Sequence, residues 1–143
     1  MFKSPKALTA KRLGDLVVID DFFEQDIYFL KIDKKFINTA MFFLKNDPDT
    51  RLTLLEQIFG INSGYLPWPL HSKETCVEIL YQLKSVKLPY RVSICAEVHS
   101  KDPIIISARN IFSGAKWCEE NIEKRLAITF EEDEQNVSRL IPW

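Results

Sequence analysis

The sequence predicts an α+β fold, in which a mostly antiparallel mixed sheet carries its helices on one face. Residues 77–84 and 90–98 alternate apolar and polar side chains, the period of half-buried antiparallel strands. Residues 34–45 instead have the apolar spacing of an amphipathic helix. The predicted elements follow the order β-β-α-β-β-β-α, which is typical of this fold class.

Composition restricts the classes of protein to which the chain can belong. Its 143 residues are 46% hydrophobic and 27% charged, which is typical of one globular domain over residues 1–143. With 19 basic and 20 acidic side chains, the net charge of −1 gives no field that would attract nucleic acid. No apolar run approaches the roughly 18 residues that cross a bilayer, and the first ten residues lack the apolar stretch of a secretory signal. We therefore expect a cytoplasmic protein that does not itself insert into a membrane.

The first half of the chain predicts two short strands followed by a helix. Residues 16–19 and 27–32 are apolar or β-branched runs, close enough in sequence to form a hairpin. Asp33 has the side chain of a helix N-cap, whose carboxylate accepts from the first free N–H groups. A helix is predicted over 34–45, and the turn-forming residues 46–48 end it.

The middle of the chain predicts a strand and a long loop. Residues 52–59 have the composition of a strand, and 60–75 are rich in glycine and proline. Loops of this length are usually functional or mobile. Tyr65, Trp68 and His71 would form a binding surface in one interpretation, whereas in the other the loop folds back as a lid over the sheet edge, which we prefer.

The last section predicts a hairpin and then a second helix. The connection 85–89 is short enough to join strands 77–84 and 90–98 as a hairpin. Ser107 has the side chain of an N-cap for a turn that reaches Phe112, and a helix then runs to about residue 126. Its apolar stripe consists of Ile111, Ala115, Cys118, Ile122 and Leu126. The acidic run 131–134 is typical of a solvated loop.

Cysteines and histidines give no pattern of metal ligands. Cys76, Cys95 and Cys118 are widely spaced, and no C-x-x-C pair is present. His71 and His99 are distant from them in sequence. We expect three reduced thiols, no metal and no cofactor, because free cysteine usually packs as a small hydrophobe. A metal site assembled from distant segments and a catalytic Cys/His pair are the weaker alternatives.

Motifs of catalysis are equally scarce, so no catalytic residue is predicted. Neither a phosphate-binding glycine loop nor a G-x-S-x-G elbow is present. Glu119 and Glu123 are spaced i, i+4 and would share one helix face with acid–base potential. A small enzyme that uses this pair is one alternative. The favoured interpretation is a charged, solvated helix face beside neighbouring lysines and an arginine.

Short motifs in the second half occur in an order that resembles a known family. The matching segments are Tyr81-Gln82-Leu83, Arg91 to Val98, Pro103 with Ser107, Ile111-Phe112, Ala115-Lys116-Trp117-Cys118-Glu119 and Ala127-Ile128-Thr129-Phe130. This order resembles the 30 kDa subunit of respiratory NADH:quinone oxidoreductase (complex I) and its relatives in membrane-bound hydrogenases. The resemblance covers about residues 30–130. The chain departs from the family pattern at Glu120, Asn121, Lys124 and Ala127.

The resemblance implies a non-catalytic structural subunit of a membrane-associated oxidoreductase or hydrogenase complex. Such a subunit holds no iron–sulfur cluster or flavin and packs against the large subunit near the quinone or nickel–iron site. It would be cytoplasmic and peripheral to the membrane through its complex. The alternative is a stand-alone globular binding protein that has kept the fold and lost the complex.

Trp117 is the residue on which the partner hypothesis depends. It lies about 150° from the centre of the helix's apolar stripe, which is unusual for so large an apolar side chain. We expect either loop 60–75 or the acidic tail to cover it, since an exposed tryptophan leaves an apolar patch. With Trp117 covered in this way, its neighbours Glu119, Glu120 and Lys124 are predicted to form the rim of a polar partner-binding surface. The alternative is that Trp117 itself contacts a partner subunit as an interface anchor.

Overall fold

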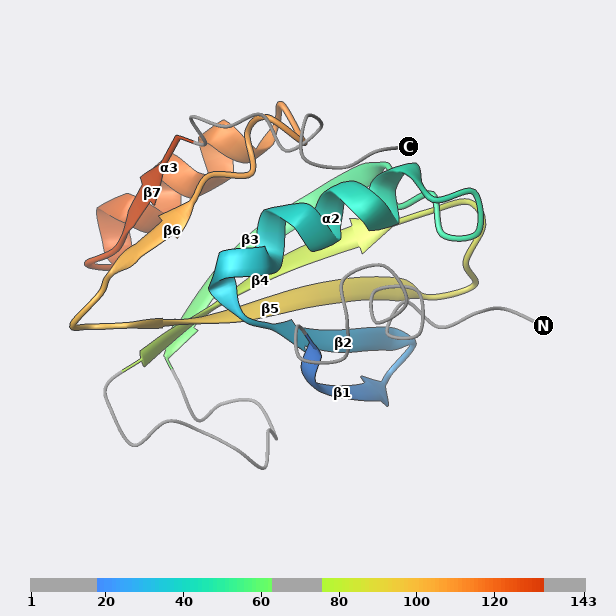
Figure 1. Ribbon diagram of the computed structural model, residues 1–143, viewed down its shortest axis with the longest axis horizontal. Helices are drawn as coiled ribbons and strands as arrows, with labels where there is room; N and C mark the ends of the chain where they lie inside the picture. The colour runs from blue at the N-terminus through green and yellow to red at the C-terminus, as the bar shows by residue number, and fades with distance from the viewer. Residues whose placement is uncertain (1–17, 63–75, 133–143) are drawn as a thin grey trace.

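A five-stranded mixed sheet forms the centre of the computed structural model, which describes residues 18–62 and 76–132 (Figure 1). Its strand order is β1-β2-β5-β4-β3. The strands are β1 (Val18–Glu24), β2 (Ile27–Ile32), β3 (Leu54–Asn62), β4 (Cys76–Lys84) and β5 (Arg91–His99). Only β2 and β5 pair in parallel, and the other neighbours are antiparallel. The predicted α+β class with a mostly antiparallel mixed sheet is confirmed.

In the described part of the chain, two helices pack on one face of this sheet (Figure 1). A 3-10 turn, η2 (Lys34–Phe36), leads into α2 (Ile37–Asn46), and α3 (Ala115–Arg125) packs beside β3. Their buried apolar residues join one core cluster with alternate residues of β4 and β5. Two three-residue strands, β6 (Ile104–Ile106) and β7 (Thr129–Glu131), pair in parallel and flank α3 in the sequence. The predicted order of elements lacked both.

The hairpin predicted from alternation is confirmed. β4 and β5 are antiparallel, with a register that runs from Val77 opposite Val98 to Leu83 opposite Val92. The alternation predicts that each strand has one exposed face, but β5 is buried on both faces. It occupies the centre of the sheet, and Cys95, which lies on the face away from the helices, is also buried. Cys95 belongs to a smaller apolar cluster on that face.

Several predicted boundaries shift. The first strand covers Val18–Glu24 rather than 16–19, although it does form a hairpin with β2. The two residues of the turn between β1 and β2, Gln25 and Asp26, both have positive φ, as a tight hairpin turn requires. Neither of them is the glycine that such turns usually contain. β3 continues to Asn62, so the first three residues of the predicted loop 60–75 belong to a strand. The remaining loop residues, 63–75, lie outside the described residues. Both interpretations of this loop, a lid and a binding surface, therefore stay predictions.

The helix predicted over 34–45 is largely confirmed. The carboxylate of Asp33 accepts a hydrogen bond from the Lys35 N–H at 3.0 Å, as an N-cap does. The first turn is 3-10 rather than α-helical, and α2 then continues to Asn46. Asp47 ends the helix by donating its N–H to the Phe43 carbonyl at 2.8 Å.

Gly60 sets the distance between α3 and the sheet. A Cβ added at Gly60 would lie 2.6 Å from Leu126 Cδ1 and 3.3 Å from Ile122 Cγ2. We expect Gly60→Val to lower the free energy of unfolding by about 1–3 kcal/mol, because overpacking forces α3 outward. Chemical denaturation measures this loss. Gly114→Ala is the control, since a Cβ there meets no atom within 4 Å, and equal stability of the two variants would contradict the prediction.

Candidate interaction site

The predicted apolar stripe of α3 faces the sheet and leaves Trp117 outside. Ala115 and Ile122 are buried, Cys118 is half-buried, and the Trp117 side chain is 68% exposed. The two segments expected to cover it, loop 60–75 and the acidic tail, lie largely outside the described residues, so cover by either of them stays a prediction. Position 117 lies on the side of the helix that points away from β3, so packing of the stripe carries the indole outward.

Glu119 lies inside the protein and not on a surface rim. Its carboxylate accepts hydrogen bonds from Ser107 Oγ at 2.5 Å and from the Ala108 N–H at 2.7 Å, and Arg109 Nη2 lies 3.5 Å away. The prediction that Glu119 borders an exposed docking surface is wrong. Glu119 follows the buried Ala115 by one helical turn, so it shares the inward side of α3. There it anchors residues 107–109 to the helix.

Glu123 also bonds to a neighbouring segment. Its Oε2 accepts a hydrogen bond from the Phe130 N–H at 3.2 Å, which connects α3 to β7. Glu119 and Glu123 therefore each hold an adjacent backbone segment against the helix. This arrangement differs from both interpretations of the pair, an acid–base site and a fully solvated face.

The buried carboxyl of Glu119 makes stability depend on pH. Burial raises its pKa above the ordinary value of 4.5, and the donors around it oppose the shift only in part. The folded chain thus holds this proton more tightly than the unfolded chain. The resulting stabilisation is present below pH 4.5 and is lost as the pH rises through the raised pKa. Denaturation of the wild type and Glu119→Gln should show the wild type losing stability relative to the variant over this range, whereas parallel curves would contradict the prediction.

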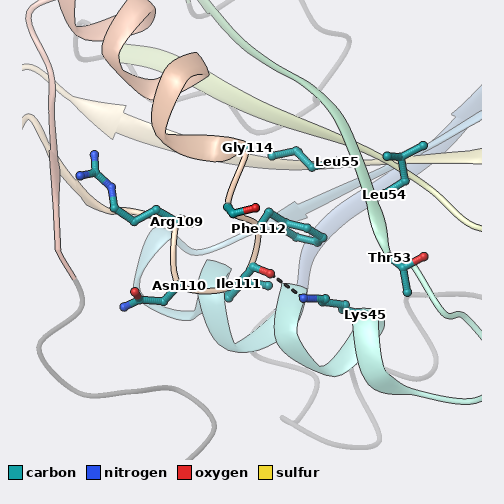
Figure 2. Close-up of a pocket in the computed structure, with 10 residues that line it drawn as sticks. Lys45, Thr53, Leu54, Leu55, Arg109, Asn110, Ile111, Phe112 and Gly114 are labelled. Atoms are coloured by element: carbon teal, nitrogen blue, oxygen red, sulfur yellow. Dashed lines mark hydrogen bonds between the residues drawn. The ribbon is translucent and has the colours of Figure 1, made fainter.

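A groove lies directly before α3, between the end of α2, the start of β3 and residues 109–114 (Figure 2). Its volume is about 550 Å³. Lys45 crosses it, donating from Nζ to the Ile111 carbonyl at 2.6 Å and lying 5.1 Å from the ring centroid of Phe112. Leu54, which is 53% exposed, forms part of the opposite wall. Sequence reasoning missed the groove, because its three segments are brought together only by the fold.

The outward side of α3 begins next to the groove. Gly114 lines the groove, and Trp117 follows it by three residues, which places both on neighbouring turns of one side. Glu120 and Lys124 are exposed and continue this line at three and seven residues beyond Trp117. We name Trp117, Glu120 and Lys124 the outer α3 face.

Metal ligation has no support among the described residues. Within 18–62 and 76–132, no three His, Cys, Asp or Glu side chains come together as a metal-binding group. Cys95 and Cys118 are reduced, and burial raises the pKa of the Cys95 thiol. His71 and the side chain of Cys76 lie outside the described part. Neither α2 nor α3 is long and apolar enough to cross a membrane.

Comparison with known proteins gives one family and a shared fold. The family described as "Respiratory-chain NADH dehydrogenase, 30 Kd subunit" matches residues 30–142. A trypsin-resistant fragment of Nqo5 has the same fold at 18% identity, with a TM-score of 0.61 over 78% of this chain and 85% of that one. A chain of the membrane-bound sulfane sulfur reductase, an archaeal respiratory membrane complex, is similar at 16% identity and a TM-score of 0.66, over 93% and 77%. No curated protein matches the sequence.

Proposed function

Because this chain belongs to the 30 kDa subunit family of respiratory-chain NADH dehydrogenase, we propose that it is a non-catalytic structural subunit of such a complex or of a related hydrogenase. The partner in this proposal is the large quinone-site or hydrogenase-like subunit. Docking occurs on the outer α3 face. The complex then holds the chain peripherally at the membrane.

One observation carries the proposal, namely the different environments of the residues in the family motif at 115–119. Ala115 and Glu119 are both fully buried, and each has a structural task within the chain. Ala115 packs in the core, and Glu119 holds residues 107–109. Trp117 contributes to neither and is 68% exposed. Because the part of the chain that the structure describes leaves most of the indole exposed, a partner surface is the environment that we propose for it.

The chemistry of the outer α3 face fits a protein partner. Tryptophan is enriched among residues that dominate binding energy, and such anchors are ringed by polar side chains that exclude water. Glu120 and Lys124 supply one charge of each sign beside Trp117. Charges in such a rim mainly set specificity and association rate, while the indole supplies buried area.

Co-expression tests the proposal. The tagged chain is produced together with the large quinone-site or hydrogenase-like subunit encoded in the same genome, and the pair is purified through the tag. The expected result is a stoichiometric complex that survives size-exclusion chromatography. Separate elution of two well-folded proteins would favour the stand-alone binding protein instead.

A further inference from the structure

We propose that the groove before α3 binds an acidic, apolar segment of the partner subunit. A carboxylate of that segment pairs with Lys45, and an adjacent apolar side chain lies between Leu54 and Phe112. The inference rests on the proposed function, since it names what the partner presents next to the outer α3 face.

Charge is the first support. Arg109 is already compensated, because its guanidinium lies 3.5 Å from Glu119 Oε1 and 3.8 Å from Glu132 Oε1. Lys45 has a backbone carbonyl and an aromatic ring as neighbours, and it forms no ion pair with any residue in the described ranges. None of the described residues that line the groove is acidic. An incoming carboxylate therefore gains a partner, whereas an incoming cation meets Lys45 and Arg109.

The fixed position of Lys45 is the second support. Its ammonium is held by the Ile111 carbonyl and the Phe112 ring, so binding a carboxylate requires little further ordering of the side chain (Figure 2). Pre-ordered groups bind more tightly because the entropy cost has been met during folding. Two of the three ammonium protons remain available to an acceptor beyond the bond to Ile111.

The apolar walls define the other half of the occupant. Leu54 is exposed in the groove although it is a large aliphatic residue, and Phe112 forms the apolar floor beneath Lys45. Trp117 lies about one helical turn beyond Gly114, on the same side of α3. An aliphatic or aromatic side chain in the groove would thus be continuous with the surface buried on Trp117. A polyanion such as nucleic acid is disfavoured, because the described lining of the groove offers one uncompensated cation and the whole chain carries a net charge of −1.

A pair of small probes tests the groove without the partner. Phenylbutyrate carries an apolar body and a carboxylate, and phenylbutylamine carries the same body and an ammonium. In amide NMR titrations we expect phenylbutyrate to shift Thr53, Ile111, Phe112 and Gly114 and to bind about five-fold more tightly than the amine, as one partly exposed ion pair allows. Lys45→Met should remove this preference while it keeps the stem over Phe112. Equal binding of both probes to the wild type, or shifts outside the groove, would overturn the proposal.

Binding of the large subunit to charge variants separates this inference from the proposed function. Lys45→Glu should weaken the complex at least about ten-fold, because it places a like charge against the incoming carboxylate. Lys35→Glu, on an exposed lysine of η2, is the matched control and should leave the affinity unchanged. If Trp117→Ala disrupts the complex and Lys45→Glu does not, the groove proposal is wrong and the docking face stands. If the wild type fails to bind the subunit while phenylbutyrate selects the groove, the proposed partner is wrong.

Discussion

Trp117→Ala is expected to weaken binding to the large subunit by at least about 30-fold, the effect of losing an interface anchor worth about 2 kcal/mol. The stability of the isolated chain should change by no more than about 0.5 kcal/mol, because an exposed side chain has little packing to lose. Titration calorimetry measures the first quantity and thermal melting the second. Such a result would place the function of the indole in the complex rather than in the fold.

Phe23→Ala is the matched control for this substitution. Phe23 is 54% exposed, but it lies on β1, at the sheet edge opposite the one formed by β3. Its removal should leave binding unchanged. A large loss of stability in Trp117→Ala with intact binding would show that the tryptophan has a structural role, contrary to its exposure.

Glu119→Ala should lower the free energy of unfolding by about 3 kcal/mol, the combined effect of losing charge-assisted hydrogen bonds to Ser107 and Ala108 in a buried site. The Ala108 N–H would be left without its carboxylate, and a cavity would form beneath α3. Urea denaturation measures the loss. Glu119 also holds Arg109 beside the groove, so we expect the substitution to make residues 109–114 less ordered as well as to lower stability.

Glu120→Ala, one position along the helix, is the control for Glu119→Ala. Glu120 is exposed, and its substitution should change the free energy of unfolding by less than about 0.5 kcal/mol. Equal effects of the two substitutions would contradict the distinction between a buried anchor and a surface charge.

Periodicity made the main elements of the fold predictable. Strands β4 and β5 repeat with period two, and α2 combines an amphipathic pattern with the Asp33 cap, so each carries its own local evidence. β6 and β7 have three residues each, which is too short for any period to be recognised. The bounds of β1 were also missed, because the apolar run 16–19 ends before the charged residues Asp20 and Asp21, which nevertheless lie in this edge strand.

The candidate site was predictable only in part. The helical wheel placed Trp117 off the apolar stripe, and this position is where the structure exposes it. Glutamate usually lies at the surface, so a buried Glu119 was not expected. Its burial depends on hydrogen-bond donors from residues 107–109, and no local sequence pattern reveals these donors. Its i+4 spacing from the buried Ala115 was the one available indication. Lys45 and the groove needed three separate segments to be brought together.

Hydrogen exchange on the chain, alone and in complex with the large subunit, tests the docking face most directly. Amides of residues 109–114 and of the exposed side of α3 should exchange more slowly in the complex, since a bound partner excludes water and suppresses local opening there. Amides of β1, at the far edge of the sheet, should be unaffected. Protection confined to β1 and β2, with unchanged exchange along α3, would contradict docking through Trp117.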